Sequence, residues 1–150
     1  MTYNNRLVSF FAAALLVLAS GMANAENSQD FGDYVVHFNA LSTDLLPASV
    51  TKQYEIKRSK NRGMVNIAVL KKNMGTAGEP TAAKLTVTAT NLTGQQRSID
   101  VREVREGQAI YYIGEFPVTD EEILRFSATI VPEGGNETYE VKFKQQFFTH

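Results

Sequence analysis

Cysteine and tryptophan are both absent from this chain, and histidine occurs only twice, at His37 and His150. Without cysteine the protein forms no disulfide bond, holds no thiolate-bound metal and has no cysteine nucleophile. A lipid-modified amino terminus is excluded for the same reason, because that modification needs a cysteine at the cleavage point. Small exported domains often depend on disulfides, so apolar packing and strand pairing must stabilise this one.

Histidine is too scarce for the common catalytic and metal-binding arrangements. A Ser-His-Asp site would need His37 or His150, and no Gly-x-Ser-x-Gly turn is present to carry the nucleophile. Two histidines are also too few for a histidine-rich metal centre. The chain has neither a glycine-rich phosphate loop nor the spacing of a calcium loop. We therefore predict no catalytic residue, no metal ligand and no cofactor.

A strong charge of either sign is missing as well. The 15 lysines and arginines nearly balance the 16 aspartates and glutamates, which gives a formal net charge of −1. Proteins that bind nucleic acids usually have a strongly basic surface. A nucleic-acid partner is therefore not expected.

The amino terminus has the pattern of a secretory signal peptide. Arg6 supplies a positive charge, residues 7–19 form an apolar run, and residues 23–25 (Ala-Asn-Ala) are the small residues that a signal peptidase reads. We predict cleavage after Ala25. The apolar run is too short to span a bilayer comfortably, and no second one follows. We expect residues 26–150 to form one domain without a membrane span.

Alternating apolar and polar residues predict strands along most of the remaining chain. Such alternation places every second side chain on the same face of a half-buried strand. The predicted strands cover residues 34–40, 64–70, 83–90, 96–105, 110–116, 126–130 and 139–147. About seven short strands in a chain of this length favour an all-β, immunoglobulin-like antiparallel β-sandwich. A small β-barrel is the alternative architecture.

Three segments do not fit the strand pattern. Residues 26–32 are polar and are predicted to be a frayed lead-in. Pro47 suits the start of a helix, and Val50 and Tyr54 are four residues apart, so residues 47–54 are predicted to be one short helix that packs on a sheet. Residues 118–122 are predicted to cross between the two sheets.

A basic run is the most distinctive charge feature of the chain. It consists of Lys57, Arg58, Lys60 and Arg62. Such a run can bind an anionic partner, such as an envelope component or an acidic patch on a periplasmic protein. Alternatively, it only keeps a hairpin tip in solution, or Arg58 and Arg62 pair with Glu103, Glu106 or Glu140 to fix the loop.

Three further residues, Tyr111, Tyr112 and His37, are candidates for partner binding. Tyr111 and Tyr112 lie beside Gly114, and tyrosines offer apolar area with a polar tip, so the pair can line a groove or belong to the core. His37 lies on the polar side of its predicted strand. Carboxylates at Glu103 and Glu106 and at residues 120–122 leave open a hydrolase that uses two acids across a cleft.

Several segments together resemble a known family of exported bacterial proteins. They are Phe31–Ala40, Leu46-Pro47, Tyr54–Arg62, Val65–Ile67, Asn91–Gln95 and Glu103–Tyr112. On these segments the chain is similar to the domain-of-unknown-function family DUF4426, over nearly all of the mature length. The resemblance implies a Gram-negative bacterium and hence the periplasm. It implies no activity, cofactor or partner.

The sequence therefore predicts a periplasmic, non-enzymatic binding module of unknown partner. Its candidate binding residues are Lys57, Arg58, Lys60, Arg62, Tyr111, Tyr112 and His37. Two alternatives stay open: a carboxylate-dependent hydrolase that acts on an envelope component, and a carrier in which Tyr111, Tyr112 and Phe116 line a cavity for a small apolar ligand.

Overall fold

The computed structural model describes residues 28–74 and 78–150, which form strands almost throughout. Its elements are β1 (Ser28–Asp30), β2 (Tyr34–Ser42), the 3-10 helix η1 (Thr43–Leu45), α2 (Ala48–Gln53), β3 (Arg62–Lys71), β4 (Glu79–Pro80), β5 (Ala83–Thr90), β6 (Gln96–Ile99), β7 (Arg102–Glu106), β8 (Ala109–Pro117), β9 (Ile123–Pro132) and β10 (Tyr139–Gln146). The predicted signal peptide lies outside the described residues.

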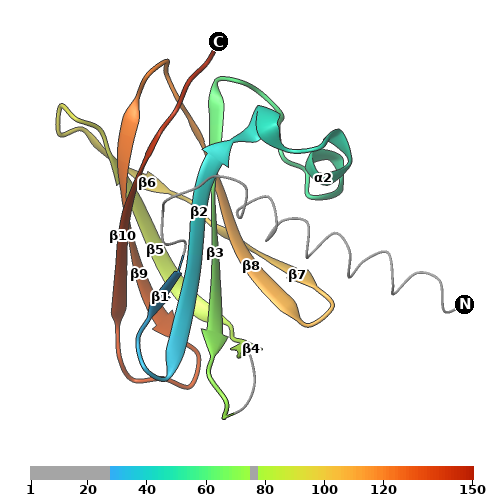
Figure 1. Ribbon diagram of the computed structural model, residues 1–150, viewed down its shortest axis with the longest axis vertical. Coiled ribbons are helices and arrows are strands. Elements are labelled where there is room, and N and C mark those ends of the chain that lie inside the picture. The colour runs from blue at the N-terminus through green and yellow to red at the C-terminus, as the bar shows by residue number, and fades with distance from the viewer. Residues whose placement is uncertain (1–27, 75–77) are drawn as a thin grey trace, which may run out of the picture.

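The strands form two antiparallel sheets that face each other (Figure 1). The larger sheet has the order β1-β2-β3-β8-β7, with β4 paired to β3, and the smaller sheet has the order β10-β9-β5-β6. Immunoglobulin domains place strands A, B, E and D in one sheet and C, F and G in the other. The same arrangement is found here. Strands A, B, E and D correspond to β2, β3, β8 and β7, and strands C, F and G correspond to β5, β9 and β10.

The predicted β-sandwich is therefore confirmed, and the described strands do not close into a barrel. The longer strands place alternate side chains between the sheets, as β2 does with its strict alternation of buried and half-buried residues. The core residues share this inward orientation; they include Val36, Phe38, Val65, Ile67, Val69, Val87, Ala89, Phe116, Leu124, Phe126, Ala128, Ile130 and Val141. β8 is apolar on both faces and lies between β3 and β7, as its sequence indicates.

The short helix lies on the outer face of the larger sheet, near one end (Figure 1). Leu46, Val50 and Tyr54 pack there with Met64 of β3 and Tyr111 of β8 in a second apolar cluster, separate from the core between the sheets. The predicted helix and its packing residues are confirmed. One side of this sheet thus contacts the other sheet, and the opposite side is covered in part by α2.

Two sequence predictions of local structure are wrong. The predicted frayed lead-in contains β1, which pairs with β2 from Ser28 opposite His37 to Asp30 opposite Val35. The single strand predicted for residues 96–105 is two strands in different sheets, since β6 pairs with β5 and β7 pairs with β8. The crossing predicted at residues 118–122 does occur, between β8 and β9.

Gly114 makes the close crossing between β6 and β7 possible. The chain leaves the smaller sheet after Ile99 and enters the larger sheet at Arg102, and it passes over Gly114 of β8. A Cβ atom on Gly114 would lie 2.6 Å from Ile99 Cγ2, 2.9 Å from the Asp100 carbonyl oxygen and 3.0 Å from Val101 Cγ1. A backbone oxygen cannot move aside as a flexible side chain does, so only glycine fits here.

None of the helices in the described part of the chain is long and apolar enough to cross a membrane.

The packing at Gly114 predicts that Gly114→Ala destabilises the protein by about 2–3 kcal/mol, because the added methyl group overfills the crossing. Gly135→Ala is the matched control, since its Cβ would meet its nearest neighbour, the Tyr34 hydroxyl, at 3.3 Å. Urea unfolding of both variants measures the difference. Equal stability of the two variants would contradict the close crossing.

Candidate functional site

An open groove of about 340 Å³ lies between the end of α2 and β7. One wall is formed by Gln53, Tyr54 and Glu55, and the other by the five consecutive residues of β7, Arg102–Glu106. Consecutive residues of a strand point to opposite faces of its sheet. A groove lined by all five therefore follows the edge of the strand as well as one of its faces.

β7 is an end strand of the larger sheet, paired only with β8. Glu106 pairs with Ala109 across the two-residue turn Gly107-Gln108, in which Gly107 has φ +58°. This positive φ at the first turn position is typical of a tight hairpin turn. Residues that flank such a turn are hydrogen-bonded to each other. Because hydrogen-bonded pairs alternate along a hairpin, Glu103 and Arg105 direct their backbone N–H and C=O groups to the open edge.

Hydrogen bonds from α2 to β7 hold the two walls of the groove together. The Tyr54 hydroxyl donates to Glu106 Oε2 at 2.8 Å, and Gln53 Nε2 donates to Glu106 Oε1 at 3.0 Å. Burial, together with the bond to Glu106, raises the pKa of the Tyr54 hydroxyl, so it stays protonated and keeps donating. The Arg102 guanidinium donates to the carbonyl oxygen of Tyr54. Both ends of this wall are thus fixed.

Glu55 has a strained backbone at the edge of the groove. The Ile56 amide donates to the Thr51 carbonyl at 2.8 Å, and the Glu55 amide donates to the Lys52 carbonyl at 3.5 Å. This pair of bonds is the Schellman motif that ends a helix, and it requires a left-handed residue, usually glycine. Glu55 takes that position with φ +55°. A non-glycine residue in this conformation costs stability and is often found at functional sites.

The charged side chains of the groove differ in their partners. Arg105 donates to Glu103 Oε1 through Nε and one terminal nitrogen, at 3.1 and 2.9 Å. Glu106 is bound by α2, and Arg102 binds the Tyr54 carbonyl. Of the charged residues that line the groove, Glu55 alone has no side-chain partner among the residues that the structure describes. It is the one charge there that is free to bind a ligand.

The four residues of the basic run differ in their contacts: the two arginines have partners within the fold, and the two lysines have no ion pair among the described residues. Arg58 Nε donates to the carbonyl oxygens of Asp44 and Leu46 at 3.2 and 3.1 Å, where η1 ends, and Arg62 lies 3.5 Å from Glu115. These two arginines therefore fix the loop, although with partners other than those the sequence suggested. Lys57 and Lys60 have exposed side chains without an ion pair among the described residues.

A buried hydroxyl holds the same loop in place. Thr43 is fully buried, and its Oγ1 lies 2.8 Å from the Lys57 carbonyl oxygen and 3.0 Å from that of Ser59. The same oxygen accepts the Ser59 amide at 2.9 Å. The basic run therefore belongs to a tightly held connection between α2 and β3, and it is not a hairpin tip.

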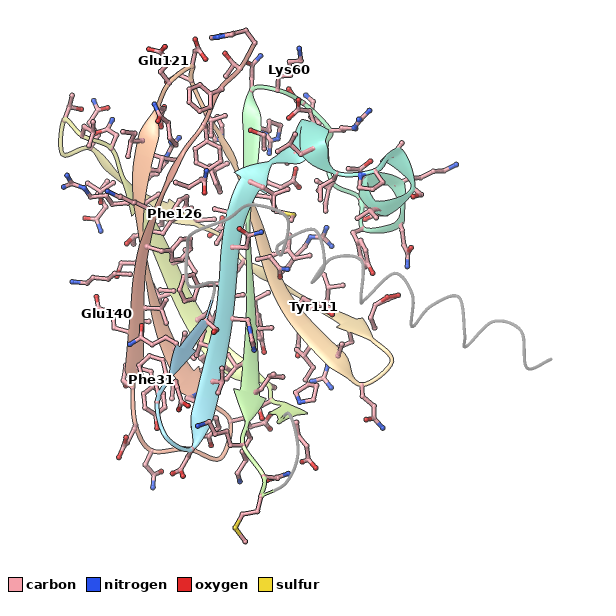
Figure 2. The ribbon with its side chains drawn as sticks, in the orientation of Figure 1. Phe31, Lys60, Tyr111, Glu121, Phe126 and Glu140 are labelled. Carbon is pink, nitrogen blue, oxygen red and sulfur yellow. The ribbon has the colours of Figure 1, made fainter. Side chains whose placement is uncertain are left out.

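The two candidate tyrosines lie on opposite faces of β8. Tyr111 joins the outer apolar cluster with Tyr54, and Figure 2 labels it on that strand. Tyr112 faces the core, and its hydroxyl accepts the Ala83 amide at 2.7 Å. Burial raises the pKa of both hydroxyls. Phe116 packs in the core against Phe126, so Tyr111, Tyr112 and Phe116 do not line one cavity.

His37 lies on the outer face of β2, opposite Ala68 of β3. Burial lowers the pKa of its imidazole. Ala68 belongs to the same outer cluster as Tyr111, so the fold brings His37 and Tyr111 to one face of the larger sheet. The basic run lies at the end of that sheet, where Arg62 of β3 pairs with Pro117. The seven candidate residues therefore do not form one site.

The acidic turn after β8 makes internal contacts. Asp120 accepts the Thr149 amide at 2.9 Å, a bond that holds the pKa of its carboxyl group below the usual value, and it pairs with His150 at 2.9 Å. Glu122 pairs with Arg97 at 2.7 Å. These carboxylates attach the chain terminus and β6 to the turn. Among residues 28–74 and 78–150, no group of three potential metal ligands is found.

Most residues of the groove have no functional signal in the sequence. Its pattern predicts only a packing role for Tyr54 and does not single out Gln53, Glu55 or Arg102. Glu103 and Glu106 are predicted only as a possible acid pair. The available signal was a helix end without glycine, since Glu55 follows directly after the predicted helix.

The fold and the sequence together define the family. The family model for the domain of unknown function DUF4426 matches residues 28–150. This chain is similar to the crystal structure of PA0388, a DUF4426 family protein from Pseudomonas aeruginosa PAO1, with a TM-score of 0.69 and 30% sequence identity. The match covers 82% of this chain and 94% of PA0388. This chain belongs to the DUF4426 family.

A more distant structure shares the fold alone. FetP of uropathogenic Escherichia coli strain F11, recombinantly expressed in the E. coli periplasm, has a TM-score of 0.56 and 13% identity. The match covers 81% of this chain and 92% of FetP. No functionally curated protein is significantly similar to this chain in sequence.

The strain at Glu55 predicts that Glu55→Gly stabilises the protein by about 0.5–1 kcal/mol, since glycine adopts the left-handed conformation without a steric cost. Glu55→Ala is the control, because it removes the carboxylate and keeps the strain. Chemical denaturation of both variants separates the two effects. A gain in Glu55→Ala as large as that in Glu55→Gly would show that charge, not strain, is responsible.

The bond between Tyr54 and Glu106 predicts a coupling energy of about 1 kcal/mol between Tyr54→Phe and Glu106→Ala. Each single change should destabilise the protein, and the double variant should cost less than the sum of the two. Unfolding free energies of the four proteins complete the cycle. Additivity within about 0.3 kcal/mol would mean that this contact does not join α2 to β7 in solution.

Proposed function

We propose that this protein is a non-enzymatic binding module of the bacterial periplasm, and that it binds an extended peptide segment of another protein along the free edge of β7. One observation carries the proposal: a groove of about 340 Å³ follows a strand that is paired on one side only. Extended peptides bind such edges by adding a strand, with backbone hydrogen bonds for affinity and side-chain pockets for specificity.

The groove has the features that strand addition needs. The backbone groups of Glu103 and Arg105 point outward and are available to a peptide. The opposite wall, Gln53–Glu55, is held by bonds to Glu106 and Arg102. Little conformational entropy is therefore lost there when a peptide binds. The volume lies within the usual range for ligand pockets.

The charge pattern favours a peptide with a basic side chain. Glu55 lines the groove without an internal partner, whereas Glu103 and Glu106 are already bound. A lysine or arginine of the peptide would pair with Glu55. The glutamates of the groove would repel an acidic side chain of a peptide. The groove would therefore prefer basic peptides to acidic ones.

Export to the periplasm is supported by two observations. Residues 1–25 have the pattern of a cleavable signal peptide. FetP, which has the same fold, was produced in the periplasm of E. coli.

The geometry favours the alternatives less. Both oxygens of Glu106 accept hydrogen bonds, and Glu103 binds Arg105. Such carboxylates are held as acceptors, whereas acid–base catalysis needs one of two acids to keep a proton. At the basic run, Lys57 and Lys60 are the cations without an internal partner among the described residues, whereas Arg58 Nε bonds the Leu46 carbonyl and Arg62 lies 3.5 Å from Glu115 of β8.

A selection experiment tests the peptide site. Heptapeptides selected from a random display library on the mature protein should be enriched in lysine or arginine. Arg105→Pro should weaken binding of these peptides at least tenfold, because proline removes an outward N–H group and blocks the edge. Fluorescence anisotropy with labelled peptides measures the affinity.

Arg105→Ala is the matched control for that substitution. It removes the same side chain but keeps the backbone N–H group, so it should change the affinity less than threefold. Glu55→Gln should weaken only the peptides that contain a basic residue. Selected peptides that bind Arg105→Pro as tightly as the wild type would overturn the proposal, and so would a library that yields no binder.

A further inference from the structure

The outer face of the smaller sheet has a composition that the peptide site does not explain. Its inward residues fill the core, so the alternate residues face away from it. Hydroxyl and basic side chains are the most numerous on this face: Lys84, Thr86, Thr88 and Thr90 on β5, Ser98 on β6, Arg125, Ser127 and Thr129 on β9, and Lys142 and Lys144 on β10. The same face also carries Gln96, Gln146 and the half-buried Ile123 and Val131. Figure 2 labels Glu140 on the same side of β10.

Two cations oppose each other directly on this face. Arg125 of β9 pairs in register with Lys144 of β10, and both side chains are exposed. Like charges directly opposite each other destabilise a sheet. The ion pairs found in the described residues include neither side chain. The positive charges of Arg125 and Lys144 therefore repel each other across the two strands. An acidic residue at either position would have removed this repulsion.

The one acidic residue in the four strands of this sheet is already bound. Glu140 accepts the Ser127 hydroxyl at 2.9 Å and lies 3.6 Å from Lys142 Nζ. It lies two rows away from Arg125 along the strands, since it pairs with Thr129. No acidic side chain of the described residues forms an ion pair with Arg125 or Lys144.

Hydroxyl groups continue the row across the sheet. Thr90 lies opposite Arg125, and in the next row Thr88 lies opposite Ser127, which in turn lies opposite Lys142. Successive rows are about 7 Å apart and strands about 5 Å apart. Sugar hydroxyl groups can pair with threonine and serine hydroxyls, while acidic substituents pair with the cations. The spacing suits an extended, repeating anion.

We propose that the outer face of the smaller sheet binds an anionic oligosaccharide, with its acidic groups bridging Arg125 and Lys144. A lipid surface fits less well, because interfacial binding also needs apolar side chains that insert. Among the described residues, the exposed large apolar side chains are those of Leu45, Met74, Leu92 and Phe148, and none lies in the strands of this sheet. The site is independent of the β7 groove, which belongs to the other sheet.

Lys144→Glu tests the proposal with two opposite readouts. A carboxylate opposite Arg125 forms a cross-strand ion pair, so the midpoint of thermal unfolding should rise by about 1–3 °C. Binding of a heparin-derived octasaccharide, measured by calorimetry at 50 mM salt, should weaken at least tenfold. A residue with only a structural role would not give this combination.

Lys71→Glu is the matched control, since it makes the same change in net charge on the other sheet. It should alter octasaccharide affinity less than threefold. An equal loss in both variants would indicate a general charge effect and overturn the proposal. It would also be overturned if inorganic phosphate bound the wild type as tightly as the octasaccharide, or if anionic phospholipid vesicles, but not the octasaccharide, bound in a Lys144-dependent way.

Discussion

A continuous series of aromatic contacts joins the two sheets and takes the place of the disulfide that immunoglobulin domains often carry. Phe38 of β2 stacks on Phe143 of β10 at 4.7 Å, Phe143 stacks on Phe126 of β9 at 4.9 Å, and Phe126 contacts Phe116 of β8 at 5.4 Å. Phe147 closes the series against Phe116 at 5.6 Å. Such pairs each contribute roughly 0.5–1.5 kcal/mol beyond the burial of their area. These contacts therefore hold the two sheets together in a chain that has neither cysteine nor tryptophan.

The packing between the sheets bears on where the two proposed sites lie. Tyr112 and Phe116 belong to the buried core between the sheets and contribute to its packing. Both proposed sites instead use an edge or an outer face of a sheet. The larger sheet offers the edge of β7, and α2 adds a second wall to it. The smaller sheet offers its outer face, which no helix of the described residues covers (Figure 1). The two proposed sites follow from this division.

The sequence predicted what depends on alternation and missed what depends on long-range pairing. The inward residues of β2 and β10, the position of β8 and the packing face of α2 all follow from local periodicity. The change of sheet after Ile99 does not, because the alternation continues from Ile99 to Val101 while the hydrogen-bond partners change. Local periodicity does not predict the groove either, since its two walls are joined by Tyr54 and Glu106, which are 52 residues apart in the sequence. Arg58 reads as a surface charge until the carbonyl oxygens near it are known.

Strain alone does not identify a binding site, as a comparison of two residues in this chain makes clear. Glu55 and Glu121 both have a positive φ. Glu121 lies in the tight turn between the sheets, and its carbonyl accepts a hydrogen bond from Gln146 Nε2 at 3.2 Å, so its conformation serves the turn. Glu55 serves a helix end equally well, but it also lines a groove beside an unpaired edge. Stability alone would favour glycine at position 55 and an acidic residue at position 125 or 144. The two proposed sites give each of these costly charges a role in binding, which stability does not provide.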